Sequence, residues 1–97
     1  MLIATAPTYS VYMVKCADAS FYCGIALDVA ARITQHNASK RGARYTKSRR
    51  PVALVYTEPC GSRSAALKRE IAIKKLSRTA KEQLIKSLRF VGTPTFP

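Results

Sequence analysis

Four side chains that could transfer protons or stabilise negative charge lie close together in the first half of the chain. They are the phenols of Tyr12 and Tyr22, the guanidinium of Arg32 and the imidazole of His36. If residues 29–37 form a helix, Arg32 and His36 lie one turn apart and share a face. A fixed positive charge beside a proton carrier suits phosphodiester cleavage, which needs charge stabilisation in the transition state and a base for the attacking water.

These side chains also have structural interpretations, which the sequence leaves open. A single histidine on an apolar helix face is often a core residue with satisfied hydrogen bonds, and both tyrosines could be cross-strand core aromatics. The register of the hairpin decides their placement. Pairing of Cys16 opposite Tyr22 puts Tyr12 and Tyr22 on one face of the sheet, whereas a loop longer by one residue puts them on opposite faces. Gly24 indicates a point where another group approaches the backbone closely.

Only one of the five acidic residues lacks an ordinary structural role. The other four fit a hairpin turn, a helix N-cap, a strand end and a capping box: Asp18, Asp28, Glu58 and Glu82. Glu70 lies near the edge of a predicted buried helix face, where a carboxylate is costly unless it is paired or bound to a cation. It could pair with Arg32 or a nearby lysine, or it could bind Mg²⁺, which prefers one or two carboxylates together with water and phosphate oxygens.

The charge balance points to a polyanionic partner. Seventeen lysine and arginine residues against five acidic ones give a net charge of +12. Nucleic acid is the first candidate and an anionic membrane surface the second. No segment approaches the ~20 apolar residues that cross a bilayer, and MLIATAP at the start lacks the features of a signal peptide.

The basic residues are densest in residues 38–51, where Gly42 and Pro51 predict a surface loop. A solvated charged face is the ordinary interpretation of such a segment. The alternative is a phosphate-contacting surface. Six residues would form it: Lys40, Arg41, Arg44, Lys47, Arg49 and Arg50.

The three cysteines, Cys16, Cys23 and Cys60, lack the paired spacing of a zinc site. Two of them fall in predicted strands, where a free thiol behaves as a small apolar side chain. We therefore expect reduced structural cysteines in a cytoplasmic protein.

The pattern predicts the element order β-β-α-β-α-α. Residues 9–16 and 21–26 form a hairpin, Asp28 caps a helix with apolar Val29 and Ile33, and residues 52–58 form a third strand that ends in a turn at 59–62. We expect an α/β fold with a small, three-stranded, mainly antiparallel sheet flanked by helices. A third strand that pairs beside the first gives the strand order 2-1-3.

Two further helices are expected after the third strand. Ser62 or Ser64 caps the first, which reaches about Leu76 and buries Leu67 and Ile71, with Ala66 and Ile73 beside them. Thr79 and Glu82 form a capping box for the second, which reaches about Arg89 with Leu84, Ile85 and Leu88 inward. Residues 9–89 are thus expected to form a single domain, with flexible tails at 1–8 and 90–97.

Together these residues resemble the GIY-YIG nuclease superfamily, and most closely its small single-domain bacterial branch. Ser10-Val11-Tyr12 stands at the first motif and Tyr22-Cys23-Gly24 at the second, while Arg32 and Glu70 match the family's helical arginine and metal-binding glutamate. The stretches CADASFYCG, QHN, GARYTKSRRPVALVY and REIAIKKLSR are typical in form, and the resemblance covers residues 9–89. Ser10 replaces Gly, and Val11 and Cys23 each replace Ile. The asparagine that some relatives carry after the glutamate has no counterpart.

This resemblance implies a DNA endonuclease that uses one divalent cation, Mg²⁺ or another such as Mn²⁺, and leaves 5′-phosphate and 3′-hydroxyl ends. Glu70 would hold the metal, Tyr12 would be the general base with help from His36 or Tyr22, Arg32 would stabilise the transition state, and Tyr45 would add a phenol near the phosphate. The implied partner is branched or single-stranded DNA in repair or recombination, with a protein partner for targeting.

Two other functions compete with this interpretation. One is a nucleic-acid-binding module that retains the nuclease fold without turnover. The other is a basic structural protein whose apparent site residues all belong to the core. The co-occurrence of the two tyrosines, Arg32, His36 and Glu70 favours the nuclease over the structural protein, whereas the sequence does not separate the nuclease from the binding module.

Overall fold

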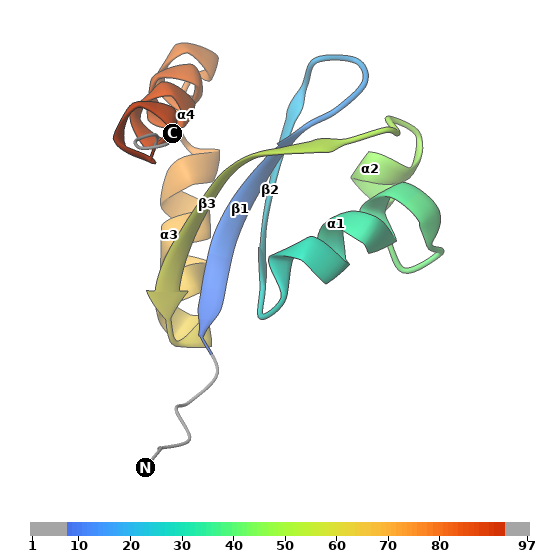
Figure 1. Cartoon of the computed structure of the whole chain (residues 1–97), viewed down its shortest axis with the longest axis horizontal. Helices are drawn as coiled ribbons and strands as arrows, with labels where there is room; N and C mark the ends of the chain where they lie inside the picture. Colours follow the sequence, from blue (N-terminus) through green and yellow to red (C-terminus); the bar gives the residue numbers. More distant parts are fainter. Residues whose placement is uncertain (1–7, 93–97) are drawn as a thin grey trace.

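A computed structural model of the chain describes residues 8–92. Its elements are β1 (Tyr9–Lys15), β2 (Phe21–Ala26), α1 (Val29–Ala38), α2 (Arg44–Lys47), β3 (Ala53–Gly61), α3 (Arg63–Lys74) and α4 (Arg78–Gly92). The three strands form one sheet in the order β2-β1-β3, and both pairs are antiparallel. Figure 1 shows α3 and α4 on one side of this sheet and α1 with α2 on the other. The predicted fold class and strand order are confirmed.

The β1–β2 hairpin places both tyrosines on one face. Its register pairs Tyr12 with Gly24 and Val14 with Tyr22. Cys16 lies opposite Ser20, to whose carbonyl its N–H donates at 2.8 Å. This register differs by two residues from the Cys16–Tyr22 pairing, which was one of the two alternatives that the sequence left open. A shift of two residues preserves the alternation of side chains, so Tyr12 and Tyr22 share one face.

Each face of the sheet has its own cluster of buried side chains, because alternate residues of β1 point in opposite directions. The α3 and α4 side is apolar, and its buried members are Val11, Met13, Cys23, Tyr56, Ile73 and Ile85. The α1 side contains Tyr12, Val14, Cys16 and Val52, with Tyr22, Val29 and Ile33 packed against them. The central strand thus carries the core on one face and the tyrosine of interest on the other.

Helix α1 is fixed at both ends. The Asp28 carboxylate accepts the Ala31 N–H at 3.0 Å, as the sequence predicts for an N-cap. Near the other end, the Asn37 side-chain amide pairs with the backbone of Val52, donating to its carbonyl at 2.9 Å and accepting its N–H at 2.7 Å. This double contact joins the end of α1 to the start of β3 and sets the position of the helix relative to the sheet.

Two predicted boundaries are corrected in the middle of the chain. Residues 38–51 are not entirely a loop, because α2 forms one helical turn at Arg44–Lys47. β3 continues to Gly61 through the predicted turn at 59–62. Pro59 is tolerated there because β3 is an edge strand, whose outer side needs no backbone donor.

The last two helices also differ from the prediction. α3 begins after Ser62, whose hydroxyl accepts the Ala65 N–H at 3.1 Å, but Ala66 and Ile73 are its buried residues and Ile71 is 54% exposed. α4 begins two residues earlier than expected, with the Ser77 hydroxyl accepting the Ala80 N–H at 3.1 Å.

The Thr79–Glu82 capping box is therefore wrong, and Glu82 instead pairs with Arg78 at 3.1 Å. α4 extends past the predicted end at Arg89 to Gly92, and Ile85 is buried as expected. The predicted tails at 1–8 and 90–97 lie mostly outside the described residues.

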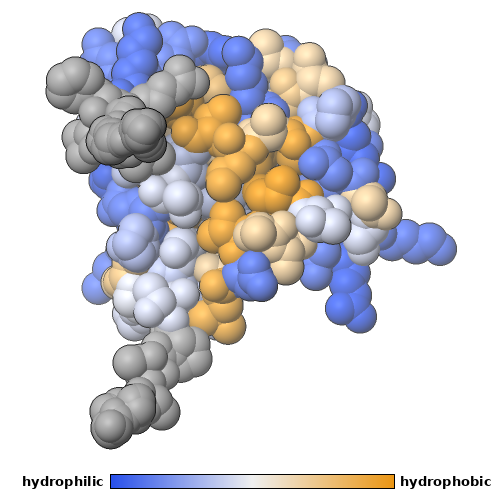
Figure 2. All heavy atoms as spheres, in the orientation of Figure 1, coloured by the Kyte–Doolittle hydropathy of each residue, from blue (hydrophilic) through white to orange (hydrophobic). Residues whose placement is uncertain are grey.

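Apolar side chains gather on part of the surface (Figure 2). Figure 2 shows apolar side chains over the middle of one face, with hydrophilic side chains bordering them on both sides. Within residues 8–92, no helix has the length and apolar character to cross a membrane.

Candidate active site

A buried hydrogen bond between Tyr12 and His36 is the centre of the candidate site. The Tyr12 phenol oxygen lies 2.6 Å from His36 Nε2, and the two residues are 1% and 0% exposed. The other ring nitrogen, Nδ1, lies 2.9 Å from the Thr46 hydroxyl and accepts the Ala43 N–H at 3.2 Å. The imidazole is therefore held at both nitrogens, by β1 on one side and by the start of α2 on the other.

Further aromatic side chains connect this buried pair to solvent. The edge of Tyr22 packs against the His36 ring with centroids 5.4 Å apart, and Tyr45 stacks on Tyr22 at 5.8 Å. The Arg49 guanidinium lies over the Tyr45 ring, 3.9 Å from its centroid. Tyr45 is 38% exposed. The structure thus brings all three candidate phenols and the imidazole into one group.

Gly24 makes room for Tyr12. A Cβ atom at this position would lie 2.5 Å from the Tyr12 phenol oxygen and 2.7 Å from its Cζ. Since Gly24 is paired directly with Tyr12 across the hairpin, the ring lies against bare backbone. The close approach expected at this glycine is present, and the group that approaches is the candidate base itself.

Burial shifts both members of the central pair toward their neutral forms. Desolvation, and next the neighbouring Tyr22, raises the pKa of Tyr12 to about 12, while the nearby Arg32 guanidinium acts in the opposite direction. Desolvation, followed by the positive charges of Arg32 and Arg50, lowers the pKa of His36 to about 4. The imidazole is accordingly neutral at neutral pH.

Arg32 lies close enough to the phenol to influence it and also organises the neighbouring loop. Its Nη1 donates to the Gln35 side chain and to the Arg41 carbonyl, both at 2.8 Å. The guanidinium therefore bridges α1 and the start of the basic segment. This places a fixed positive charge beside Tyr12.

Glu70 lies on the inner face of α3, in line with buried Ala66 and Ile73. Its side chain is 16% exposed and pairs with Lys74 at 3.5 Å. Of the structural alternatives, pairing with a lysine is therefore present, whereas the ion pairs within residues 8–92 include none between Glu70 and Arg32. Of the neighbouring groups that shift the pKa of Tyr12, Glu70 raises it with the smallest effect.

A site in which Glu70 is the one protein ligand suits some metal ions and not others. The described residues hold no group of three or more His, Cys, Asp or Glu side chains that could bind a metal together. This donor set does not suit structural zinc, which takes four protein ligands. Mg²⁺ is bound through one or two carboxylates, with waters and substrate phosphates completing its coordination. A shielded, inward-facing Glu70 fits that kind of site.

The six basic candidates divide into two groups. Arg50 donates to the carbonyls of His36, Gln35 and Ser39, and so closes the C-terminal end of α1. Arg49 pairs with Asp18 at 3.0 Å. The other four are exposed and form none of the side-chain hydrogen bonds or ion pairs found within residues 8–92: Lys40, Arg41, Arg44 and Lys47.

Sequence patterns alone do not indicate Thr46, Ala43 or the role of Asn37 in the site. Thr46 is fully buried although it lies within a strongly basic segment, next to Lys47 and two residues after Arg44. A single threonine within such a polar segment gives no periodic signal, and the Ala43 contribution comes from its backbone. Asn37 stood in the quoted stretch QHN, but nothing local indicates its partner Val52, which is brought to it by the fold.

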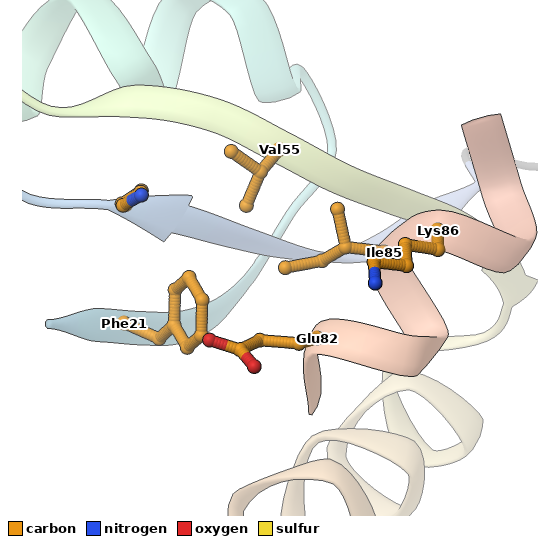
Figure 3. Close-up of a pocket in the computed structure, with 6 residues that line it drawn as sticks. Phe21, Val55, Glu82, Ile85 and Lys86 are labelled. Atoms are coloured by element: carbon orange, nitrogen blue, oxygen red, sulfur yellow. The ribbon is translucent and has the colours of Figure 1, made fainter. Parts of the chain in front are cut away.

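A separate hollow of about 380 Å³ lies between the sheet and α4, on the opposite face from Tyr12. Figure 3 shows the Glu82 carboxylate beside the Phe21 ring, with Val55 and Ile85 opposite. Arg78 already pairs with Glu82 and covers the Phe21 ring at 4.4 Å. The hollow is lined by none of the residues around His36 and not by Glu70, and it is therefore separate from the candidate site.

The fold and this group of residues define a nuclease-like α/β domain. The GIY-YIG catalytic domain matches residues 8–83. The chain therefore belongs to the GIY-YIG family.

Relatives and solved structures agree with that assignment. The chain is 58% identical over 81 residues to the UPF0213 protein DP2720 of Desulfotalea psychrophila, covering 84% of this chain and 74% of the relative. It is 53% identical over 79 residues to a UPF0213 protein of Staphylococcus aureus, covering 81% and 95%. The solution structure of EF2693 from E. faecalis is similar with a TM-score of 0.61 at 37% identity, covering 98% of this chain and 100% of that one.

Gly24→Ala should displace the Tyr12 ring and destabilise the fold by about 1–3 kcal/mol, the usual cost of overpacking. Urea unfolding measures this cost. The same substitution in a Tyr12→Leu background provides the control, because the ring that the new methyl would meet is then absent. An equal cost in both backgrounds would show that Gly24 does not serve to accommodate Tyr12.

Acidification should destabilise the protein through His36. The unfolded histidine binds a proton below about pH 6.5, whereas the buried ring resists protonation until about pH 4. The free energy of unfolding is therefore highest near pH 7 with respect to this residue and decreases as the pH falls from about 6.5 toward 4. We expect a decrease of about 2 kcal/mol at pH 4.5. Urea unfolding of wild type and His36→Gln at both pH values isolates this effect from that of the carboxylates. A difference between the two proteins that does not change with pH would contradict it.

Proposed function

We propose that this protein is a divalent-metal-dependent endonuclease that hydrolyses phosphodiester bonds in DNA. The observation that carries the proposal is the 2.6 Å hydrogen bond between Tyr12 and His36 within a GIY-YIG catalytic domain. A phenol beside an imidazole and a guanidinium supplies the groups that such a hydrolysis needs.

Tyr12 is the proposed general base. In its ionised form the phenolate takes a proton from a water molecule, the water oxygen bonds to phosphorus, and the bond from phosphorus to the 3′ oxygen of the sugar breaks. The leaving oxygen takes up a proton from solvent, which leaves a 5′-phosphate and a 3′-hydroxyl. Tyr22 and Tyr45 line the approach from solvent to this phenol, since they stack between the His36 ring and the surface.

Arg32 and Glu70 provide the electrostatic part of the proposal. The Arg32 guanidinium, held by Gln35 and the Arg41 carbonyl, stabilises the extra negative charge of the transition state. Glu70 would hold Mg²⁺ or Mn²⁺, which when bound supplies positive charge next to the scissile phosphate. Lys74 would then give up its contact with Glu70, a pair whose lysine is already 52% exposed.

A second candidate function is a nucleic-acid-binding module without turnover. Two observations favour it: Tyr12 is 1% exposed, and the Glu70 carboxylate already has a cationic partner. Both observations concern the protein without substrate, and active-site contacts of this kind rearrange when substrate binds. Cleavage is therefore the property that separates the two candidates.

We further propose that DNA is bound by the exposed cations of residues 40–47. Lys40, Arg41, Arg44 and Lys47 are exposed and follow directly after α1, which carries Arg32 and His36. Arg49 and Arg50 hold this segment in place, Arg49 by its ion pair with Asp18 and Arg50 by its hydrogen bonds to the carbonyls at the end of α1. The free thiols at Cys16, Cys23 and Cys60 support a reducing, cytoplasmic compartment.

Glu70→Gln should abolish Mg²⁺-dependent cleavage of a panel of linear, nicked, flapped and four-way DNA. Binding should be equal or tighter, because a carboxylate near a phosphate repels it. Glu82→Gln is the matched control, since Glu70 and Glu82 each pair with a cation one turn away along their helix. Either substitution should cost only about 0.3–0.5 kcal/mol of stability, the value of such a helical pair. Retained cleavage by a strongly destabilised Glu70→Gln protein would refute the catalytic role.

Replacing Lys40, Arg41 and Arg44 by alanine should weaken binding to all DNA sequences about equally. The slope of the logarithm of the DNA association constant against the logarithm of the salt concentration should become less steep by about 0.9 for each phosphate that these side chains no longer neutralise. The control replaces three exposed lysines on or next to α3 and α4, Lys68, Lys75 and Lys86, which changes the net charge by the same amount. If both variants show the same decrease in affinity and slope, the effect is one of net charge and residues 40–47 form only a solvated surface.

A further inference from the structure

We propose that the segment leading into α2 holds the His36 ring in the neutral form that carries its hydrogen on Nε2. In this form the ring donates a hydrogen bond to the Tyr12 phenol oxygen and cannot accept the phenol's proton. His36 is then a positioning residue for Tyr12 rather than a base. The catalytic consequence rests on the function proposed above, whereas the state of the ring does not.

The direction of the Ala43 N–H determines the state of Nδ1. A backbone N–H can only donate, and the peptide plane fixes where its hydrogen points. The Ala43 nitrogen lies 3.2 Å from His36 Nδ1 with its hydrogen directed at it. Nδ1 must therefore offer a lone pair, and the ring hydrogen of the neutral imidazole lies on Nε2.

The Thr46 hydroxyl supports the same assignment. Its oxygen lies 2.9 Å from Nδ1 and 2.9 Å from the Ala43 carbonyl oxygen, so it could donate to either. That carbonyl already accepts the N–H groups of Thr46 and Lys47 at 3.0 and 3.1 Å. An oxygen with two lone pairs is thereby satisfied, and the hydroxyl hydrogen is available to Nδ1. The one lone pair of Nδ1 is then shared by the Ala43 N–H and the Thr46 hydroxyl, and Nδ1 carries no hydrogen of its own.

The charged form of the ring is excluded by its surroundings. His36 is fully buried, and the groups that face it are the cations Arg32 and Arg50 and the phenols Tyr12 and Tyr22. No carboxylate is among the groups that shift its pKa, which burial and the two cations lower to about 4. The single ring hydrogen therefore lies between Nε2 and the Tyr12 oxygen, which are 2.6 Å apart.

This arrangement assigns distinct tasks to the two residues. A hydrogen bond donated to a phenol oxygen favours the phenolate over the phenol. His36 by this hydrogen bond and Arg32 by its positive charge thus favour the ionised form of Tyr12. The proton that Tyr12 loses goes to solvent, and the proton that it later takes from water returns it to the phenol.

The test is the nitrogen NMR spectrum of protein labelled with ¹⁵N-histidine. His36 is the only histidine of the chain, so one pair of ring nitrogens is observed. At pH 7 we expect Nε2 in the range of a protonated nitrogen and Nδ1 in that of an unprotonated one, with both unchanged down to pH 5. The reverse assignment, or two averaged nitrogens, would overturn the proposal, because Tyr12 would then donate to the ring.

Two variants of Thr46 test how the ring is held. Thr46→Val keeps the shape and removes the hydroxyl, whereas Thr46→Ser keeps the hydroxyl and removes the methyl. The valine variant should raise the ratio of the form with hydrogen on Nδ1 to the form with hydrogen on Nε2 about tenfold, the effect of one hydrogen bond of ordinary strength. The serine variant should restore the wild-type spectrum. An unchanged spectrum in the valine variant would show that Thr46 plays no part.

The catalytic consequence has a separate readout. On a cleaved DNA substrate, Thr46→Val should lower kcat by about tenfold with KM unchanged, and Thr46→Ser should recover it. If the wild type shows the expected nitrogen spectrum but cleaves no DNA, the ring assignment stands and the proposed nuclease function fails. If cleavage is observed with the reverse ring assignment, the function stands and this inference fails.

Discussion

The buried contact between Tyr12 and His36 is the interaction on which the rest of the site depends. It joins the central strand β1 to α1 across the interior. Removing either partner would leave a buried polar group unsatisfied, which costs about 1–3 kcal/mol. Gly24 provides the space for the ring, and Thr46 with the Ala43 N–H fixes the imidazole from behind. Every buried side-chain nitrogen or oxygen within residues 8–92 has a partner.

The two faces of the sheet differ in what they bury, and the candidate site draws Tyr12 and His36 from the α1 side and Glu70 from α3. The α3 and α4 face is packed with aliphatic and aromatic side chains and supplies most of the apolar core. The α1 face accommodates a phenol, an imidazole and a threonine hydroxyl because a network of hydrogen bonds satisfies them. A small domain has few apolar residues available for burial. Concentrating them on one face leaves the other free for polar groups whose burial is costly.

The basic residues serve two purposes that their charge alone does not distinguish. Arg50 closes the end of α1 through three carbonyls, and Arg49 links the hairpin turn to α2 by its contacts with Asp18 and the Tyr45 carbonyl. The neighbouring exposed cations have no such contacts within the described part of the chain. A planar guanidinium with five donors can bridge several backbone oxygens, which a lysine ammonium does less well. The two arginines therefore shape the segment that presents the others.

The sequence by itself determined the three strands and the three longer helices in their order, the Asp28 cap and the membership in the GIY-YIG family, whereas the hairpin register that puts Tyr12 and Tyr22 on one face was left open. These depend on alternation, on local capping and on residues close together in the chain. Tertiary structure decided the start of α4 at Ser77, the exposure of Ile71, the extension of β3 past Pro59, and the roles of Thr46, Asn37 and Arg50. The reason is physical. A hydrogen bond to a backbone group far along the chain, such as that of Asn37 to Val52, leaves no periodic trace in the sequence, and it forms only when the fold brings its partner within reach.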